Sequence, residues 1–440
     1  MARVRGWQLA EWRGRARSKL GLAVLRALLR YARAQPSPQP ATARERVVIL
    51  LVSAWGMGGT IRAALNLAAY LSRDRDVEIL STVRFRDESF FGAFPPGVTV
   101  EAIDDQRPGG APRGPVRWIR RALDRVPSVL VHPADRAAQH HTLWFDLQVA
   151  RRLRRGSGYL IATRPGLNMA VARLRLPGFV TIGEEQMHLL HHDRRLRAAM
   201  PQRYRGLDAL VVLTERDVER YTKLLKGKVR VERIPNTVRE LSGRPADPGA
   251  KVVLAAGRMT AQKGFDMLID AYAQVAREHP DWRLRICGAG PWRKRLEAQI
   301  DAHALADVIE LPGPSDDLGG EMEAASIFVL SSRFEGFPLV LLEAMSKRLA
   351  VVAFDCPTGP SDIVDDHENG ILVPPKDVDG LARGIREMIE HEELRRRCGA
   401  AAVDTARQYA IDAIGPRWDA LFRELAQGRA HAAGVAAPVT

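Results

Sequence analysis

Short apolar runs alternate with segments of helical periodicity along almost the whole chain. "RERVVILLVS" at 44–53 is a β-branched apolar run, "AWGMGGT" is glycine-rich, and "IRAALNLAAYLSRD" places its apolar residues at helical spacing. This strand–loop–helix rhythm predicts a parallel sheet with helices on both faces. Further apolar runs at 76–85, 128–132, 158–164, 179–183 and 207–214 are expected to be strands of the same sheet.

The alternation is interrupted at 236–250, where "NTVRELSGRPADPGA" is rich in Pro and Gly and lacks periodicity. A second series of apolar runs and helical segments begins with "KVVLAAGR" at 251, and 440 residues are enough for two domains. We therefore predict an α/β protein with two Rossmann-like, doubly wound domains, at 44–240 and 250–425, that face a central cleft. The last helix could pack back on the first domain, and a flexible tail is expected at 428–440.

The chain begins with a basic extension and a Pro-rich linker, at 1–43. Residues 1–33 carry nine Lys or Arg and one Glu, a local charge of +8 within a total of +14. The apolar stretch "LGLAVLRALLRY" is interrupted by Arg26 and Arg30, so neither secretion nor a transmembrane helix is predicted. Arg-rich segments with Trp and Leu are typical of helices on anionic membrane surfaces. The alternative is a solvated extension without a specific role. Nucleic acid is not an expected partner, because no aromatic-basic motif accompanies the charge.

Cysteine usage indicates a reducing compartment. Cys287, Cys356 and Cys398 are widely spaced, odd in number and form no CxxC pair. The expected location is the cytoplasm, and a membrane-binding extension would place the protein at the inner face of the plasma membrane.

Basic side chains follow the first strand of the second series. In "AAGRMTAQKGFDMLIDAY", Gly257 and Arg258 come after the strand and Lys263 stands before a helix. Arginine can hold a phosphate through two hydrogen bonds, and lysine adds a point charge, so together they could neutralise a diphosphate without a metal. An ordinary charged loop is the alternative. In the next strand-to-helix turn, Gly288 and Gly290 would let the backbone approach a ligand closely, although Gly-x-Gly alone is a weak signal.

Two glutamates eight positions apart stand in "SSRFEGFPLVLLEAMS" at 331–346. Glu335 lies in a loop after an apolar strand, and Pro338 suits the first position of the following helix, whose positive end would favour a phosphate. Glu343 falls inside the apolar helix, where a buried carboxylate needs hydrogen bonds. We predict that Glu335 binds sugar hydroxyls and Glu343 the two hydroxyls of a ribose. The alternative is a capping carboxylate and a core glutamate with satisfied hydrogen bonds.

With these motifs, residues 45–425 resemble the retaining GT-B glycosyltransferases of family four. A further match is "DCPTGPSDIVDDHENGILVPPKD" at 355–377, whose Cys-Pro-Thr-Gly-Pro loop is similar to that of bacterial cell-surface polysaccharide and teichoic-acid-like transferases. The resemblance implies a nucleotide-sugar donor on the second domain, an acceptor on the first, retention of anomeric configuration, and no metal or other cofactor. Carried over to this chain, it implies catalytic roles for Arg258, Lys263 and Glu335. Donor contacts are implied for Gly257, Gly288, Gly290, Gly336, Phe337, Pro338 and Glu343.

The first half matches that family less well. "GMGGT" at 56–60 resembles its glycine-rich first loop, so Gly58 and Gly59 would border the cleft. Where many relatives carry Glu-His, this chain has "GEEQMHLLHH" at 183–192, which places Gln186 at the usual His position, and His188 could substitute for it. His188 and the pair at 191–192 also have a helical metal-ligand spacing, but a surface helix is the favoured interpretation and no metal site is predicted.

Two basic stretches of the first domain lie at 107–125, "RPGGAPRGPVRWIRRALDR", and at 150–156, "ARRLRRG". They could face an anionic acceptor, such as a phosphate-containing polymer or a lipid-linked glycan, or they could be helix ends that favour cations.

The expected function is that of a retaining hexosyltransferase. It would move a hexose or N-acetylhexosamine from a nucleotide sugar, expected to be a UDP-sugar, to a cell-envelope glycan, glycolipid or teichoic-acid-like acceptor. One alternative is a catalytically silent nucleotide-sugar-binding subunit of a membrane glycan assembly complex, which Gln186 favours. Another is a basic membrane-surface scaffold that acts through residues 1–33.

Overall fold

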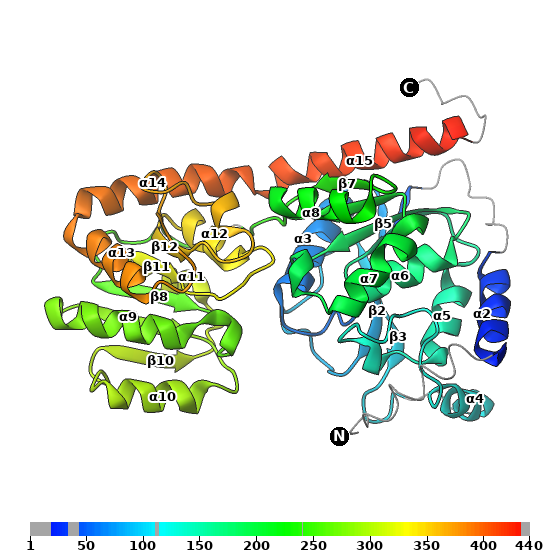
Figure 1. Ribbon diagram of the computed structural model, residues 1–440, viewed down its shortest axis with the longest axis horizontal. Helices are drawn as coiled ribbons and strands as arrows, with labels where there is room; N and C mark the ends of the chain where they lie inside the picture. Colours follow the sequence, from blue (N-terminus) through cyan, green and yellow to red (C-terminus); the bar gives the residue numbers. More distant parts are fainter. Residues whose placement is uncertain (1–18, 34–43, 111–113, 240, 433–440) are drawn as a thin grey trace. The chain divides into compact units, whose positions relative to one another are not determined.

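The computed structural model describes residues 19–33, 44–110, 114–239 and 241–432. Within these ranges the chain forms two compact units, each built on a parallel sheet with helices on both faces (Figure 1). The first unit extends to Val212, continues over Arg216–Ile234 and takes up the chain again from Gly415. The second unit comprises Leu213–Glu215 and Pro235–Ile414. The predicted fold class, two doubly wound α/β domains, is confirmed.

The first unit holds a seven-stranded sheet among the described residues, in the order β3-β2-β1-β4-β5-β6-β7. All neighbouring strands pair in parallel. The chain first moves outward from β1 to β3 and then from β4 to β7, which is the doubly wound order with its switch point between β1 and β4. The strands are β1 (Arg46–Leu51), β2 (Asp76–Arg84), β3 (Val98–Asp105), β4 (Gly158–Ala162), β5 (Phe179–Glu185), β6 (Ala209–Val212) and β7 (Arg230–Arg233).

Both faces of this sheet are covered. Val48 and Leu50 of β1 point into one core, while Val47 and Ile49 are equally buried on the opposite face, which is why the strand is apolar throughout. The covering helices are α3 (Gly59–Leu71), α5 (Leu143–Leu153), α6 (Pro165–Leu174), α7 (Arg194–Arg203) and α8 (Glu215–Leu225), with a further helix, α4 (Pro115–Leu123), at the edge.

Helix α2 (Lys19–Ala32) packs on the first unit and is not a free helix. Leu25, Leu28 and Ala32 are buried in the core that α5 and α6 also build. Arg33 Nε donates a hydrogen bond to Leu174 O at 3.3 Å. The described part of the basic extension therefore uses its apolar face inside the protein. The remainder of the extension, residues 1–18, and the linker at 34–43 lie outside the described residues.

The run "SVLVH" at 128–132 is not a strand, contrary to the prediction. Its backbone is held by a carboxylate from α5: Asp146 accepts hydrogen bonds from Ser128 Oγ at 2.5 Å and from Val129 N at 2.6 Å. Ser128 Oγ in turn accepts from the N–H of Leu130 and Val131. Ser128, Leu130 and Val131 are buried, and the side chains of Asp146 and Ser128 take the place of a neighbouring strand as hydrogen-bond acceptors. The sequence interpretation also missed β3 and β7, which are less apolar because they lie at the sheet edges.

The second unit holds a six-stranded parallel sheet in the order β10-β9-β8-β11-β12-β13 among the described residues. Alternate residues of β8, such as Val253 and Leu254, enter different cores on the two faces. The strands are β8 (Val252–Ala256), β9 (Arg283–Cys287), β10 (Ile309–Gly313), β11 (Ile327–Leu330), β12 (Ala350–Phe354) and β13 (Ile371–Val373). The helices are α9 (Phe265–Glu278), α10 (Arg293–Ala302), α11 (Leu318–Glu323), α12 (Leu339–Ser346), α13 (Val378–Glu390) and α14 (Glu392–Gln408).

The last helix, α15 (Ile411–Ala432), joins the first unit from Gly415 onward. Phe422 stacks on Tyr159 with ring centroids 4.2 Å apart, and Asp419 pairs with Arg75 at 2.9 Å. The helix continues past residue 428, where a flexible tail was expected, and residues 433–440 lie outside the described ranges. In those ranges no helix combines the length and the apolar character that crossing a membrane requires.

Candidate functional site

Three loops of the second unit are joined by hydrogen bonds at the carboxyl ends of its central strands. The loop after β8 reaches the loop after β9 through Met259 N, which donates to Ala289 O at 2.9 Å. It reaches the loop after β11 through Arg333 N, which donates to Gln262 O at 2.8 Å. Because β9, β8 and β11 are neighbours in the sheet, their loops form one continuous edge, where doubly wound proteins bind ligands.

Lys263 and Glu335 meet at this edge although 72 positions separate them in the sequence. Lys263 Nζ lies 2.7 Å from Glu335 Oε1, and Ser332 Oγ donates to the same oxygen at 2.6 Å. The two charged side chains are 17% and 8% exposed, so the pair is largely shielded from water. The sequence prediction that these two residues belong to one site agrees with this contact, while their roles remain predictions.

The predicted diphosphate ligand Arg258 stands at the surface beside Gly257. Among the described residues its guanidinium has neither a hydrogen bond nor an ion pair, so its charge is available to a ligand. A different arginine, Arg333, is held at the same edge by Asp266, with two contacts of 2.7 and 2.8 Å. Sequence reasoning missed this bidentate pair, since Asp266 reads only as an acidic residue in the first turn of α9.

Glycines in these loops allow close backbone approach. A Cβ at Gly288, whose φ is +152°, would lie 1.8 Å from Gly257 O, and a Cβ at Gly290 would lie 2.4 Å from Met259 O. A Cβ at Gly257 would lie 2.9 Å from Lys263 Cε, so this glycine leaves room for the lysine stem. Gly264, which the sequence analysis did not select, has φ +65°, and a Cβ there would lie 2.1 Å from Ser331 O. These glycines are therefore required by the packing of the loops on one another.

The segment after β11 differs by one position from the prediction. Pro338 is the N-cap of α12, not its first residue, and Leu339 begins the helix. The N–H groups of Leu339 and Leu341 donate to Phe337 O and Pro338 O at 3.0 and 2.9 Å, so fewer donors are left for a phosphate than expected. Glu343 lies on α12 and is 5% exposed, which agrees with the predicted burial.

The Cys-Pro-Thr-Gly-Pro segment runs beside the Glu335 loop. Glu335 N donates to Pro357 O at 3.0 Å, and Thr358 N donates back to Glu335 O at 3.1 Å. Thr358 Oγ1 also donates to Gly336 O at 3.4 Å. Burial raises the pKa of the Cys356 thiol well above its usual range, so this cysteine is a structural residue of the loop. The segment therefore positions the backbone on both sides of the Glu335 side chain.

The predicted acceptor-side residues lie at the carboxyl ends of β1 and β5 in the first unit. Gly58, with φ +155°, is the N-cap of α3, and Gly59 is the first residue of that helix. Gln186 Nε2 donates to Glu184 Oε1 at 2.7 Å, and both side chains are buried. Burial raises the pKa of Glu184 to about 7, which makes it the titratable group at this edge that sequence reasoning missed. The sequence feature that could have pointed to Glu184 is its position near the end of an apolar run, which the structure shows to be a fully buried strand.

His188, two positions after Gln186, is buried, and burial lowers the pKa of its imidazole to about 4. It precedes the short 3₁₀ turn Leu189–His191, so the expected surface helix is absent at this point of the described chain. The neighbouring His192 lies 3.1 Å from Glu185. In the described ranges, the one group of side chains that satisfies metal-ligand spacing lies elsewhere, at Glu278, His279 and Glu390.

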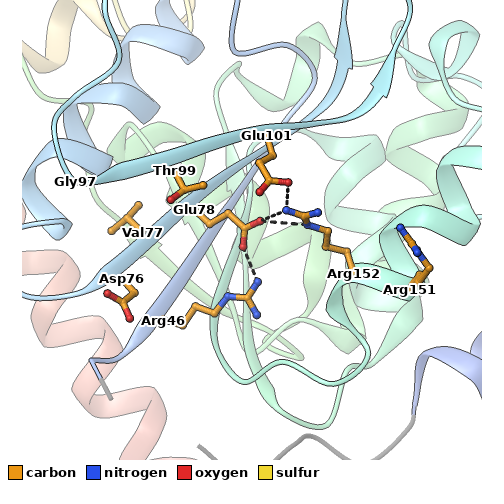
Figure 2. A pocket seen from close by; sticks show the side chains of 9 residues that line it. All are labelled: Arg46, Asp76, Val77, Glu78, Gly97, Thr99, Glu101, Arg151 and Arg152. Atoms are coloured by element: carbon orange, nitrogen blue, oxygen red, sulfur yellow. Dashed lines mark hydrogen bonds and ion pairs between the residues drawn. The ribbon is translucent and has the colours of Figure 1, made fainter. Parts of the chain in front are cut away.

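A separate depression lies at the opposite, amino-terminal edge of the first sheet (Figure 2). Glu78 stands between two arginines there, with Arg46 at 2.5 Å and Arg152 at 3.1 Å, and Arg152 also contacts Glu101. Because the charges that line it neutralise one another, this depression carries no predicted role.

The folds of solved structures identify the architecture as GT-B. Sucrose-phosphate synthase from Thermosynechococcus elongatus superposes with a TM-score of 0.70 at 19% identity, over 88% of this chain and 100% of that one. TarM from S. aureus superposes with a TM-score of 0.68 at 15% identity, over 86% of this chain and 99% of that one. At such identities the likeness establishes the fold alone.

Sequence comparison relates the second unit to a known family. Residues 240–405 match the family described as Glycosyl transferases group 1. A Streptomyces coelicolor protein named exopolysaccharide phosphotransferase is 35% identical over 396 residues, which are 87% of this chain and 41% of that protein. An Erwinia amylovora protein, amylovoran biosynthesis glycosyltransferase AmsD, is 32% identical over 38% of this chain and 46% of its own length. The chain thus spans less than half the length of these two curated relatives.

Proposed function

We propose that the chain is a retaining glycosyltransferase that moves a hexose or N-acetylhexosamine from a UDP-sugar to a cell-envelope glycan, glycolipid or teichoic-acid-like acceptor. The observation that carries this proposal is the contact between Lys263 and Glu335, with Gly257 and the exposed Arg258 beside it, inside the segment that matches the glycosyltransferase family. A lysine, an arginine and a shielded carboxylate at one sheet edge suit a ligand that carries both a diphosphate and sugar hydroxyls.

In the proposed reaction the bond between the anomeric carbon and the diphosphate oxygen breaks, and its electron pair leaves with the diphosphate. Arg258 and Lys263 stabilise the negative charge that develops there, while positive charge grows on the sugar. Glu335 accepts hydrogen bonds from sugar hydroxyls, and Glu343 from the ribose. The acceptor hydroxyl attacks the sugar from the side of the leaving group and gives its proton to the departing diphosphate oxygen, so the anomeric configuration is retained. We assign no side chain as a nucleophile.

The donor and acceptor classes are supported by what similar proteins are named for. The TarM structure contains UDP and α-GlcNAc-glycerol. A Bacillus subtilis protein that is 25% identical over 53% of this chain is a poly(glycerol-phosphate) α-glucosyltransferase. We further propose that turnover needs no metal, because the side chains of Arg258 and Lys263 would neutralise the diphosphate. Activity should therefore persist in the presence of a metal chelator.

The experiment is a donor panel. The purified chain is incubated with UDP-, GDP- and ADP-sugars, with and without glycerol-phosphate polymer or glycan acceptors, and the released nucleotide is identified. We expect UDP from one UDP-sugar, loss of this release in Glu335→Gln and Lys263→Met, and an α-linked product from an α-donor by NMR. Normal release in both variants would contradict the assigned site.

A second candidate function comes from the S. coelicolor relative, whose name describes a phosphotransferase. A sugar-phosphate transferase would break the bond between the two phosphates and release UMP, whereas a glycosyltransferase releases UDP. The same assay therefore separates the two reactions. Nucleotide binding without release of either product from any donor and acceptor would instead favour a silent nucleotide-sugar-binding subunit.

A further inference from the structure

Helix α4 (Pro115–Leu123) presents apolar side chains to solvent. Trp118 is 69% exposed, Ile119 54% and Val116 43%, and the helix buries none of its residues. With about 100° between successive residues, the apolar residues occupy one side of the helix and its three arginines the other. An amphipathic helix normally packs its apolar side on the protein, and α4 does the reverse.

Ion pairs explain this inverted orientation. Arg120, on the polar side, has a largely buried side chain that contacts Asp104 Oδ1 at 2.7 Å and donates to Asp105 O at 3.1 Å. It also contacts Asp124, one turn further along the chain, at 3.3 Å. These contacts attach the polar side of α4 to the end of β3. Because Trp118 projects from the side of the helix opposite Arg120, it points away from the unit.

The charges next to this apolar side indicate what covers it. The Arg121 guanidinium lies 5.3 Å from the Trp118 ring centroid, and Arg117 and Arg125 are exposed nearby. A soluble polyanion would use the arginines but would gain nothing from an exposed Trp and Ile. An anionic bilayer uses both, because the apolar side chains enter the acyl region while the arginines contact the headgroups.

We propose that α4 is the surface by which this chain binds an anionic lipid bilayer. This assignment differs from the sequence prediction, which placed membrane binding in residues 1–33. The described half of that segment, α2, buries Leu25 and Leu28 in the core of the first unit, so those side chains are unavailable to lipid. The inference does not depend on the proposed catalytic activity, since vesicle binding requires no donor.

The test is co-sedimentation of the full chain with vesicles of phosphatidylglycerol and phosphatidylcholine in equal parts, and with phosphatidylcholine alone. We expect binding to the anionic vesicles only. The double variant Trp118→Ser/Ile119→Ser should lower the partition coefficient about tenfold or more, and Arg121→Gln about fivefold. Leu190→Ser is the matched control, because Leu190 is, like Trp118 and Ile119, a large apolar residue exposed to solvent (55%), but it lies outside α4. Circular dichroism and the thermal midpoint establish that each variant is folded.

A spectroscopic measurement locates the contact. In vesicles of brominated lipid, part of the tryptophan fluorescence should be quenched, and Trp118→Phe should remove that part while binding persists. Quenching that instead disappears in a Trp7→Phe/Trp12→Phe variant would assign the contact to the N-terminal extension and overturn the proposal.

Three further results would also overturn it. One is wild-type binding by Trp118→Ser/Ile119→Ser. Another is a wild-type chain that does not bind anionic vesicles but forms a dimer that the double variant loses, because α4 would then contact a second copy. The third is that the chain binds soluble polyphosphate and that substitution of Trp118 weakens this binding as much as it weakens vesicle binding. A soluble polymer, and not a bilayer, would then be the ligand of this surface.

Discussion

The Lys263–Glu335 pair allows a quantitative test of the proposed donor site. Lys263→Met keeps the apolar stem of the lysine but leaves Glu335 with the Ser332 hydroxyl as its side-chain partner in the described part of the chain. Removing one member of a well-buried ion pair costs about 3–5 kcal/mol, whereas exposed pairs contribute about 0–1 kcal/mol. With side chains 17% and 8% exposed, and with Ser332 still donating, we expect a loss of about 2 kcal/mol. For a unit of this size, a loss of about 2 kcal/mol lowers the midpoint temperature of thermal unfolding by about 4–8 °C.

A double-mutant cycle isolates the interaction. Lys263→Met, Glu335→Gln and the double variant are unfolded thermally and by denaturant, and UDP affinity is measured by titration calorimetry. We expect a coupling energy of about 2 kcal/mol between the two side chains. We also expect weaker UDP binding in Lys263→Met and in the double variant. A coupling energy below about 0.5 kcal/mol would refute the reasoning, because the two charges would then not interact as the structure shows.

The matched control is a second lysine–glutamate pair in the same unit. Lys347 Nζ lies 3.0 Å from Glu323 Oε1, with side chains 3% and 24% exposed, and it lies outside the three loops of the site. Because Lys347 Nζ also donates to Ser242 O and Arg244 O, Lys347→Met should lower stability by at least as much, while UDP affinity and turnover stay unchanged in the folded protein. Loss of UDP affinity in this control would show that the calorimetric effect of Lys263→Met reports on folding alone.

Three further predictions concern single residues. Gly288→Ala should lower stability by more than about 2 kcal/mol and weaken UDP binding, since its Cβ would meet Gly257 O at 1.8 Å, whereas Gly249→Ala, with 3.4 Å to its nearest neighbour, should be nearly neutral in thermal unfolding. Burial raises the pKa of Glu184 from 4.5 to about 7, so the folded state retains a proton that the unfolded state releases, and this group's contribution to the unfolding free energy falls as the pH rises from about 4.5 to 7. The stability of Glu184→Gln relative to the wild type should therefore rise across that window, by up to about 1.4 kcal/mol per pH unit, and a constant difference in pH-dependent denaturant unfolding would contradict the assigned burial. Glu343→Gln should weaken UDP binding more than binding of 2′,3′-dideoxy-UDP, and equal losses for both nucleotides in calorimetry would rule out the ribose contact.

Much of the candidate site follows from local sequence rules. The strands β8, β9 and β11 were recognisable as apolar runs, and a functional residue after a parallel strand must lie at the carboxyl edge of the sheet. Arg258, Lys263 and Glu335 could therefore be selected before any contact was known. The Arg333–Asp266 pair could not, because each residue alone resembles an ordinary surface charge and only the sheet order brings them together.

The errors have a common cause in tertiary packing. The run "SVLVH" has the apolar composition of a strand, but its backbone N–H groups donate to the side chains of Asp146 and Ser128, so they are satisfied without a neighbouring strand. Pro338 was placed one position too far into its helix, because the end of a helix depends on hydrogen bonds that a residue pattern does not specify.

Hydrophobic periodicity and chain order are local properties, so they are sufficient to predict the two βα series, the parallel sheets that these build and the strand ends that carry the candidate site residues. Which apolar helix face remains exposed was decided only by the tertiary structure. Helices α2 and α4 are both short, basic and amphipathic, yet α2 buries Leu25 and Leu28 in the core, whereas an ion pair from Arg120 turns Trp118 of α4 outward. Burial depends on partners that are distant in the sequence, and for this reason two similar segments of one chain expose opposite faces to solvent.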